Sequence, residues 1–311
     1  MPQPIPYQGS KRIIAQQILQ NFPQQIDTLI EPFSGSAAIS IAASYHRKAK
    51  RFLLNDLNEP LMELLETIIN NPHKIADDYE LLWRTQIGQR RTYYDFIRDE
   101  FNKTHRPDYF LYLLARCVKA SVRYNASGEF NQSPDNRRKG RRPISMRQEI
   151  VAVSHLLQGK TIVTSGDYKD ILETVTELDL VYMDPPYQGT SQTKDPRYYR
   201  GLALDELVDF LMELNKRHIS YLLSYDGRTG KKTYGNQLPA ELNLHQLEIY
   251  AGRSTQSTLL GKNSKTYESL YLSPTLTQRL QRNQNHVVAK FMPVQPEYRN
   301  LYPEQMEIAF A

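Results

Sequence analysis

Four consecutive residues, Asp184, Pro185, Pro186 and Tyr187, combine an acceptor, a stiff backbone and a flat ring directly after the apolar run "LDLVYM". Prolines lack a backbone N–H and favour an extended preceding residue, so Asp184 ends a strand and does not lie inside a helix. The Asp184 carboxylate and the Pro185 carbonyl, side by side, suit an exocyclic amino group. Tyr187 offers a face on which a nucleic acid base stacks for about 1 to 3 kcal/mol. A plain proline-rich turn is the alternative.

Three other apolar segments end in residues of similar character. "EPFSGSAAIS" places Gly35 and Ser36 at a helix start, where the backbone can approach a ligand closely. Asp56 in "LLNDLN" either accepts hydrogen bonds from the hydroxyls of a ribose or caps the following helix. In "SGDYKD", Asp167 and Tyr168 either hold an adenine by hydrogen bonding and ring contact or serve a helix cap.

Strand and helix patterns alternate around these segments. Apolar runs of strand length occupy residues 26–31, 51–56 and 178–184, each with a helical pattern after it. This rhythm predicts a mostly parallel, doubly wound α/β sheet, whose strand ends open into a common crevice. The last two strand patterns, 242–251 and 266–273, have no helix between them, so we expect an antiparallel pair at a sheet edge.

The alternation stops between about residues 71 and 160, where charged helical segments and a polar stretch rich in Arg, Asn, Gly and Pro take its place. We therefore predict a catalytic domain formed by residues 1–70 and 161–274, with residues 71–160 as an inserted, mainly helical domain. Residues 275–311 are polar with scattered prolines, and we expect this C-terminal extension to wrap the surface.

The second half of the insertion carries an excess of basic residues, as a surface that follows DNA phosphates requires. They are Lys119, Arg123, Arg137, Arg138, Lys139, Arg141, Arg142 and Arg147, against the acids Glu129 and Asp135. Polar and aromatic residues lie among them, namely Tyr124, Asn125, Phe130, Asn131 and Gln132. Asn and Gln can read base edges and rings can fill a vacated base stack, which favours DNA binding over a solvated basic face.

The composition excludes several classes of protein. The 311 residues are 40% hydrophobic with a formal net charge of +5, as in ordinary globular proteins. No run approaches about eighteen apolar residues and the first residues lack a signal-peptide core, so we expect a cytoplasmic protein with no membrane partner. Cys117 is the single cysteine, in an apolar helical pattern, and the seven histidines are scattered. We therefore expect no disulfide, no cysteine nucleophile and no metal.

Taken together, these separated motifs resemble those of one family. "PYQGSK", "EPFSGSAA", "NDLN" and "DPPY" are similar, in content and order, to the motifs of Dam-like adenine-specific DNA N6-methyltransferases, of the D12 class and alpha group. Residues 122–134, "VRYNASGEFNQSP", resemble the "RYN..GEFN.P" hairpin of the same family. The resemblance spans residues 4 to about 273. It implies a Rossmann-like S-adenosylmethionine-dependent methyltransferase fold, S-adenosylmethionine as cofactor and a flipped adenine in double-stranded DNA as substrate.

The resemblance also implies a role for each motif residue. The implied cofactor-binding residues are Tyr7, Lys11, Phe33, Gly35, Ser36, Asp56, Asp167, Tyr168 and Asp184. The implied catalytic residues, which hold the target adenine, are Asp184, Pro185, Pro186 and Tyr187. The predicted DNA-binding residues are Lys119, Arg123, Tyr124, Asn125, Phe130, Asn131, Gln132, Arg137 and Arg138. Ser10 and Ser36 stand where family members often have glycine, a departure that concerns turn geometry.

Two alternatives remain open at this stage. One keeps the fold and methylates the amino group of cytosine, or of adenine in RNA. Asp184 favours adenine, because related cytosine enzymes usually begin this motif with Ser or Asn. The other is a DNA-binding regulator without catalysis, which the complete "DPPY" motif disfavours. The sequence leaves open the DNA site, a separately acting cognate restriction endonuclease, and the choice between a monomer and a weak dimer.

Overall fold

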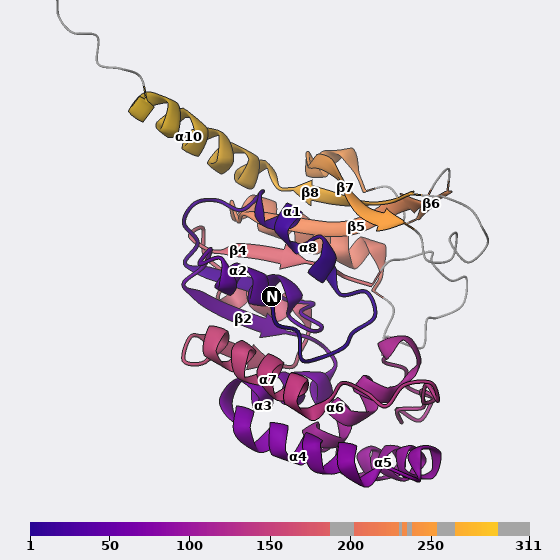
Figure 1. The fold of residues 1–311 in the computed structure, drawn as a ribbon. Helices are drawn as coiled ribbons and strands as arrows, with labels where there is room; N and C mark the ends of the chain where they lie inside the picture. Colours follow the sequence, from indigo (N-terminus) through magenta and orange to yellow (C-terminus); the bar gives the residue numbers. More distant parts are fainter. Residues whose placement is uncertain (187–201, 230–231, 235–237, 254–264, 292–311) are drawn as a thin grey trace, which may run out of the picture.

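The computed structural model describes residues 1–186, 202–229, 232–234, 238–253 and 265–291, built around one sheet of eight strands (Figure 1). The strands are β1 Thr28–Glu31, β2 Arg51–Asn55, β3 Thr161–Thr164, β4 Leu180–Met183, β5 Tyr221–Thr229, β6 Lys232–Tyr234, β7 His245–Arg253 and β8 Lys265–Leu272. Their order across the sheet is β3-β2-β1-β4-β5-β8-β7, and β6 pairs with β5 beside this path.

The pairing follows the predicted doubly wound pattern. β3, β2, β1, β4 and β5 run parallel, with β1 in register with β2 from Thr28 opposite Arg51 to Glu31 opposite Leu54. β8 pairs antiparallel with β5 and with β7, which confirms the antiparallel pair expected at the end of the sheet. The strand order reverses between β1 and β4, so their carboxyl ends flank the crevice in which such sheets bind ligands.

Helices cover both faces of the sheet. Three of them, α1 Ala15–Leu19, α2 Ala38–Tyr45 and α3 Glu59–Asn70, share a buried cluster with Leu29 and Tyr182. On the other face, α8 Leu204–Lys216 shares a second cluster with Ile30 and Val181. Neighbouring strand residues thus alternate between the two clusters, as the period of two in a strand requires.

The predicted insertion is mainly helical. Its helices are α4 Pro72–Thr85, α5 Arg90–Thr104, α6 Pro107–Arg116 and α7 Pro143–Leu157. Three of them begin with a proline, whose fixed φ and missing N–H suit the first helical position. α7 packs against α2 and α3 as well as α4, and one hydrophobic cluster runs from the sheet into the insertion. The proposed boundaries at residues 70 and 160 therefore remain a prediction, because the core is continuous across them.

The short connecting helices and the chain's end complete the described part. The 3-10 helices are η1 Lys11–Ile13, η2 Val118–Ala120, η3 Tyr168–Glu173 and η4 Ala240–Leu242. The expectation that the chain wraps the surface after Pro274 is wrong for its first part, which forms the helix α10 Pro274–Phe291 and extends away from the sheet (Figure 1). The first turn of α10 is anchored to the rest of the protein, because Leu276 is fully buried. The Arg279 guanidinium donates to the carbonyls of Gln25 and Asp179. Among the described residues, no helix is long and apolar enough to cross a bilayer.

Candidate active site

The turn after β1 brings the N-terminal segment against the sheet. The Ser34 N–H donates to the Asn55 carbonyl at 2.8 Å, which ties the turn to the end of β2. Gly35 has φ +48°, and a Cβ at this position would lie 3.1 Å from the ring of Tyr7. Glycine is therefore required here both for its backbone conformation and for the close approach of Tyr7.

Asp56 follows β2 and faces the same turn. Its Oδ2 accepts from the Gly35 N–H at 2.9 Å and its Oδ1 from the Asn58 N–H at 3.0 Å, while burial raises the pKa of the carboxyl. The side-chain cap of α3 is Asn58, whose Oδ1 accepts from the Leu61 N–H at 3.3 Å. Asn58, and not Asp56, therefore provides the side-chain cap of α3.

The end of β3 supplies an aromatic wall. Tyr168 stacks on Phe33 with ring centroids 5.0 Å apart and an interplanar angle of 30°, and contacts Phe210 edge to face. Burial raises the pKa of the Tyr168 hydroxyl to about 12. Asp167 caps η3, because its carboxylate accepts from the Lys169 N–H at 2.9 Å, and the remaining carboxylate surface is exposed.

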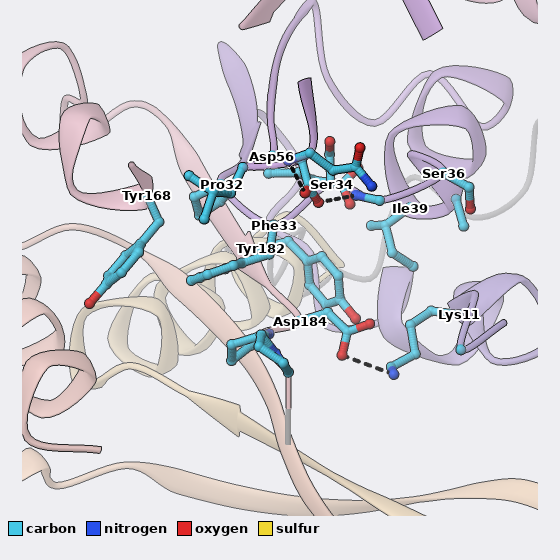
Figure 2. Close-up of a pocket in the computed structure, with 18 of the residues that line it drawn as sticks. Lys11, Pro32, Phe33, Ser34, Ser36, Ile39, Asp56, Tyr168, Tyr182 and Asp184 are labelled. Atoms are coloured by element: carbon cyan, nitrogen blue, oxygen red, sulfur yellow. Dashed lines mark hydrogen bonds and ion pairs between the residues drawn. The ribbon is translucent and has the colours of Figure 1, made fainter. Parts of the chain in front are cut away.

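Asp184 at the end of β4 faces a buried cation. Lys11 Nζ lies 2.9 Å from Asp184 Oδ1 (Figure 2). The same ammonium lies 3.3 Å from Oε2 of Glu268, a residue of β8. The Lys11 side chain is 8% exposed and that of Asp184 22%, so the pair is shielded from solvent but remains open to a ligand. Tyr187, the last residue of the motif, lies outside the described residues.

These strand ends line one cavity of about 490 Å³, which we call the strand-tip cavity. It is lined by all nine predicted cofactor residues, namely Tyr7, Lys11, Phe33, Gly35, Ser36, Asp56, Asp167, Tyr168 and Asp184, and by Pro185 and Pro186. Figure 2 shows Lys11 and Asp184 at one end of the cavity and Tyr168 at the other. The sequence thus identified a set of residues that the fold brings together, while their roles in binding remain a prediction.

The structure adds two residues that the sequence reasoning missed. Asn55 Nδ2 donates to the carbonyls of Pro32 at 3.3 Å and Gly166 at 3.0 Å, so it joins three strand ends around the cavity. Glu31 lines the cavity with 2% exposure, and its Oε1 accepts from the Ser40 N–H at 2.7 Å. Burial raises the Glu31 pKa to about 8. An acid directly before the glycine turn is a signal that could have identified Glu31.

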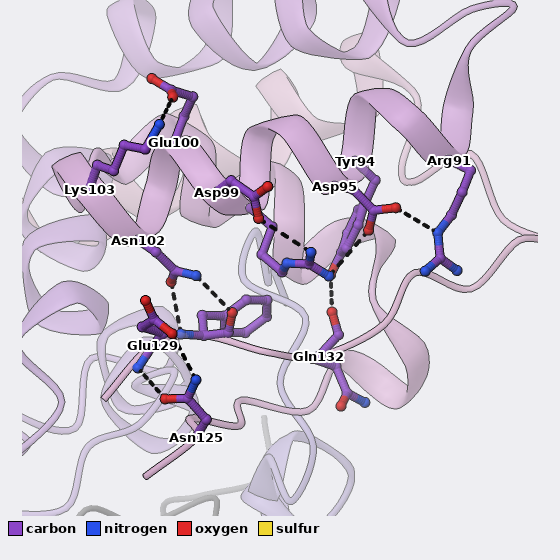
Figure 3. A network of polar contacts seen from close by, with 12 residues as sticks. Arg91, Tyr94, Asp95, Asp99, Glu100, Asn102, Lys103, Asn125, Glu129 and Gln132 are labelled. Atoms are coloured by element: carbon purple, nitrogen blue, oxygen red, sulfur yellow. Dashed lines mark hydrogen bonds and ion pairs between the residues drawn. The ribbon is translucent and has the colours of Figure 1, made fainter. Parts of the chain in front are cut away.

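The hairpin of residues 122–134 is held against α5. Asn102 donates to the Phe130 carbonyl at 3.1 Å and accepts from the Phe130 N–H at 2.8 Å, and the Tyr94 hydroxyl donates to the Gln132 carbonyl at 2.8 Å (Figure 3). Asn125 shapes the hairpin turn, because its Oδ1 accepts from two backbone N–H groups of the turn. The hairpin is therefore a fixed part of the insertion.

Three of the predicted DNA-binding residues of this hairpin are buried in the structure. Phe130 is 1% exposed and packs its ring between Phe101 and Tyr124, and Tyr124 is itself 7% exposed. Gln132 is 8% exposed and donates to the Val118 carbonyl at 2.9 Å. Residue types alone do not encode this packing, in which the three side chains support the hairpin from inside.

Other predicted DNA-binding side chains are exposed, namely those of Lys119, Arg123, Asn131, Arg137 and Arg138. Arg137 and Arg138 both lie near Asp135, at 3.1 and 3.4 Å, yet remain 86% and 69% exposed. Lys119 and Ala120 both have positive φ, 59° and 51°, which is a strained conformation outside glycine and is common at functional sites.

Two other basic residues of the insertion are committed to internal contacts. Arg147 pairs with Asp77 of α4 at 2.5 Å. The Arg141 guanidinium donates to the Gln3 carbonyl at 2.8 Å and lies 3.3 Å from Glu149. The basic residues of the insertion thus include some with a structural role, such as Arg141 and Arg147, and the exposed ones described above.

Cysteine and metal chemistry find no support in the described part of the chain. Cys117 lies one residue beyond α6, at 3% exposure, and burial raises the pKa of its thiol to about 12. A thiol of that kind is a poor nucleophile at neutral pH. Among the described residues, no group of three or more His, Cys, Asp or Glu side chains could hold a metal ion.

The strand order, the glycine turn and the acids that follow the strands around one cavity define a Rossmann-like α/β protein with a candidate ligand site at its strand ends. The chain belongs to the family described as D12 class N6 adenine-specific DNA methyltransferase, whose model matches residues 7–251. This family membership confirms the resemblance identified from the sequence motifs.

Relatives differ in how much of their length this chain covers. The DNA N-6-adenine-methyltransferase of Escherichia phage P1 is 30% identical over 226 residues, which are 72% of this chain but 28% of the phage protein. The Type II methyltransferase M.MjaIII of Methanocaldococcus jannaschii is 29% identical over 237 residues, 70% of this chain and 81% of its own. The DNA adenine methylase of Escherichia coli K12 is 27% identical over 225 residues, 70% and 77% of the two chains.

Proposed function

We propose that this protein transfers a methyl group from S-adenosylmethionine to the amino nitrogen of an adenine that is flipped out of duplex DNA. The observation that carries the proposal is Asp184, which ends β4 before two prolines, faces Lys11 at 2.9 Å and lines the same cavity as Asp56 and Phe33. One cavity thus offers acceptors for an amino group beside a site for a nucleoside.

The residues present fit such a cofactor. Gly35 and Asp56 line the cavity, and they would hold the ribose side of the cofactor. The stacked Phe33 and Tyr168 rings would form a wall for its adenine. When bound there, S-adenosylmethionine supplies an electrophilic methyl group on a sulfonium. Lys11 lies beside Asp184 and Tyr7 beside Gly35, and we assign both to the methionine end of the cofactor.

The protein's contribution to the reaction is positioning. The amino nitrogen of adenine is a poor nucleophile because its lone pair is delocalised into the ring. Asp184 and the Pro185 carbonyl accept hydrogen bonds from the amino group and direct the lone pair toward the methyl donor, while Lys11 orients the carboxylate. Alignment of this kind can lower the activation barrier by about 7 to 11 kcal/mol. Asp184 need not be a strong base, because the methylated nitrogen is cationic and readily loses its proton.

DNA recognition falls to the exposed part of the insertion. Flipping a base costs a few kcal/mol, which contacts elsewhere must offset. Lys119, Arg137 and Arg138 are exposed, and we assign them to phosphates. Arg123 and Asn131 of the hairpin are also exposed, and we assign them to base edges. A site-selection assay in which Arg123→Ala leaves the sequence preference unchanged would remove that role for Arg123.

The proposal is tested by transfer of radiolabelled methyl to unmethylated duplex DNA, with the product base identified by mass spectrometry. We expect N6-methyladenine from the intact protein and at most a trace from Asp184→Asn, which keeps the size of the side chain. Arg147→Ala, which removes an ion pair with Asp77 inside the insertion, serves as the active control. Methylcytosine as the product, or methyl transfer to RNA alone, would show that the substrate is not adenine in DNA. DNA binding without methyl transfer to any substrate would favour a regulator without catalysis.

A further part of the proposal concerns the role of DNA methylation in the cell. M.MjaIII carries the name of a Type II methyltransferase. By analogy, we propose that methylation by this chain protects its recognition site from a separately acting restriction endonuclease. Digestion of methylated and unmethylated DNA with a panel of nucleases that share the mapped site tests this, and equal digestion by every enzyme of the panel contradicts it.

A further inference from the structure

Tyr124 connects the hairpin of the insertion to the strand-tip cavity. Its side chain is 7% exposed, and its hydroxyl donates a hydrogen bond to Asn58 Oδ1 at 3.1 Å. The two residues are 66 positions apart in the sequence. The neighbouring residue Arg123 is exposed, so adjacent side chains of the hairpin differ, one facing solvent and the other bonded to Asn58.

Asn58 passes this contact to the acid that we assign to the ribose. Asn58 lines the cavity, and its Oδ1 also accepts from the Leu61 N–H at the start of α3. Its own backbone N–H donates to Asp56 Oδ1 at 3.0 Å, and Asp56 Oδ2 accepts from the Gly35 N–H at 2.9 Å. A continuous chain of hydrogen bonds therefore runs from Tyr124 to the glycine turn.

The opposite side of Tyr124 is fixed by the hairpin. Its ring contacts Phe130 edge to face at 6.1 Å, and the two residues form a backbone bridge. A second contact joins the same part of the insertion to the cavity, because the Gln8 N–H donates to the Ala120 carbonyl at 3.0 Å and Gln8 is a lining residue. The insertion thus contacts the cavity wall at two places, through Tyr124 of the hairpin and through Ala120 just before it.

We propose that Tyr124 is a positioning residue for the cofactor site, through which the insertion holds Asn58 and Asp56 in the geometry that binds the nucleoside. The identity of the cofactor and of the DNA rests on the proposed function. The sequence motifs predict only DNA binding for the insertion, whereas Tyr124 connects the insertion to the cofactor site. The hydroxyl of Tyr124 should therefore affect cofactor binding and leave DNA binding unchanged.

The test removes only this hydroxyl. Tyr124→Phe keeps the ring against Phe130, and we expect it to weaken binding of S-adenosylhomocysteine, measured by calorimetry without DNA, about three- to tenfold, the range for one neutral hydrogen bond. Tyr94→Phe is the matched control, because the Tyr94 hydroxyl supports the same hairpin through the Gln132 carbonyl but has no contact with Asn58 among its hydrogen bonds. It should bind as the unaltered protein does.

Kinetics with S-adenosylmethionine and unmethylated PCR-amplified duplex DNA separate the two sites. Tyr124→Phe should raise KM for the cofactor and leave KM for DNA unchanged. Asn58→Ala, which also removes the cap of α3, should raise KM for the cofactor at least as much. Adding Tyr124→Phe to it should cause little further loss, because both changes break the same Tyr124–Asn58 hydrogen bond.

Three results would overturn the proposal: cofactor binding by Tyr124→Phe equal to the unaltered protein, an equal loss in Tyr94→Phe, or a rise confined to KM for DNA. The failure of the proposed function would look different. In that case the unaltered protein would methylate no DNA, while calorimetry with S-adenosylhomocysteine would still report whether Tyr124 supports the site.

Discussion

The Lys11 ammonium lies 2.9 Å from Asp184 Oδ1 and 3.3 Å from Glu268 Oε2, so one buried cation holds a carboxylate from the end of β4 beside a carboxylate of β8. A bulge in β5 lies next to this contact, since the register with β8 shifts between Ser224 and Gly227, and Gly227 is opposite Glu268. A Cβ at Gly227 would lie 2.5 Å from the Tyr267 carbonyl oxygen. Bulges of this kind re-aim side chains beside active sites.

The first prediction concerns this cation. Lys11→Met keeps most of the apolar stem but removes the ammonium that lies 2.9 Å from Asp184. We expect the single-turnover methylation rate to fall about 10²-fold, the effect of misplacing a reacting group by about 1 Å. Glu268→Gln, which leaves Lys11 on Asp184, should lose about threefold to tenfold, as expected for one weakened hydrogen bond. Rapid-quench assays at saturating cofactor measure both. An unchanged rate in Lys11→Met would show that Asp184 is oriented by other groups.

The second prediction concerns Asn55, which is 4% exposed and donates to the carbonyls of Pro32 and Gly166. Asn55→Asp removes both donors and places a carboxylate beside two carbonyl oxygens. We expect the free energy of unfolding to fall by about 1 to 3 kcal/mol or more, because buried acceptors lose their partners. Urea unfolding with an unchanged m value measures it.

Thr164→Val is the control for this measurement, because it removes a single hydrogen bond, from the Thr164 hydroxyl to Asn55 Oδ1 at 3.0 Å. It should cost about 0.5 to 1.5 kcal/mol. A loss in Asn55→Asp no greater than in Thr164→Val would mean that Asn55 does not hold the strand ends together.

Asn55 also shows where sequence reasoning stops. The end of a buried strand can be recognised locally, from an apolar run and the residue that follows, so Asp56, Asp167 and Asp184 could all be placed at one edge of the sheet. The contacts of Asn55 join segments 23 and 111 positions away. No local pattern encodes them, because they depend on strands that only the folded sheet brings together.

The hairpin of the insertion gives the complementary lesson. Aromatic residues among basic ones fit a base-reading surface, but the same rings fit a small core equally well. Asn102 and Tyr94 on α5 decide between these, since their hydrogen bonds hold the hairpin with Phe130 facing inward. The sequence therefore predicted the hairpin and the exposed Arg123, and it could not predict which aromatic rings the helix would cover.

The third prediction is a dependence of stability on pH from Glu31, whose burial raises its pKa from about 4.5 to about 8. Below about pH 4.5 the carboxyl is protonated in both the folded and the unfolded chain. Between about pH 4.5 and 8 the unfolded chain has lost the proton that the folded chain keeps. The free energy of unfolding therefore falls as pH rises through this window, by at most about 1.4 kcal/mol per unit.

Glu31→Gln removes the titrating proton and retains an acceptor for the Ser40 N–H. Relative to the unaltered protein, the variant should gain stability steadily from pH 5 to pH 8 in urea unfolding. Glu129→Gln, at an exposed position of the hairpin, should keep the original pH dependence. Parallel curves for Glu31→Gln and the unaltered protein would contradict a neutral Glu31 in the folded state.

The fourth prediction concerns the exposed arginines near Asp135. Each basic side chain that neutralises a phosphate contributes about 0.9 to the slope of log K against log salt concentration. Arg138 is 69% exposed, so Arg138→Ala should lower the magnitude of this slope by about 0.9 for a duplex DNA, measured by fluorescence anisotropy between low and moderate salt. Arg147, committed to Asp77 at 2.5 Å and to Glu80 at 3.5 Å, should leave the slope unchanged on substitution by Ala. Equal slopes for both variants would place the DNA on another face of the insertion, because the contrast between them depends only on which arginine is available to phosphates.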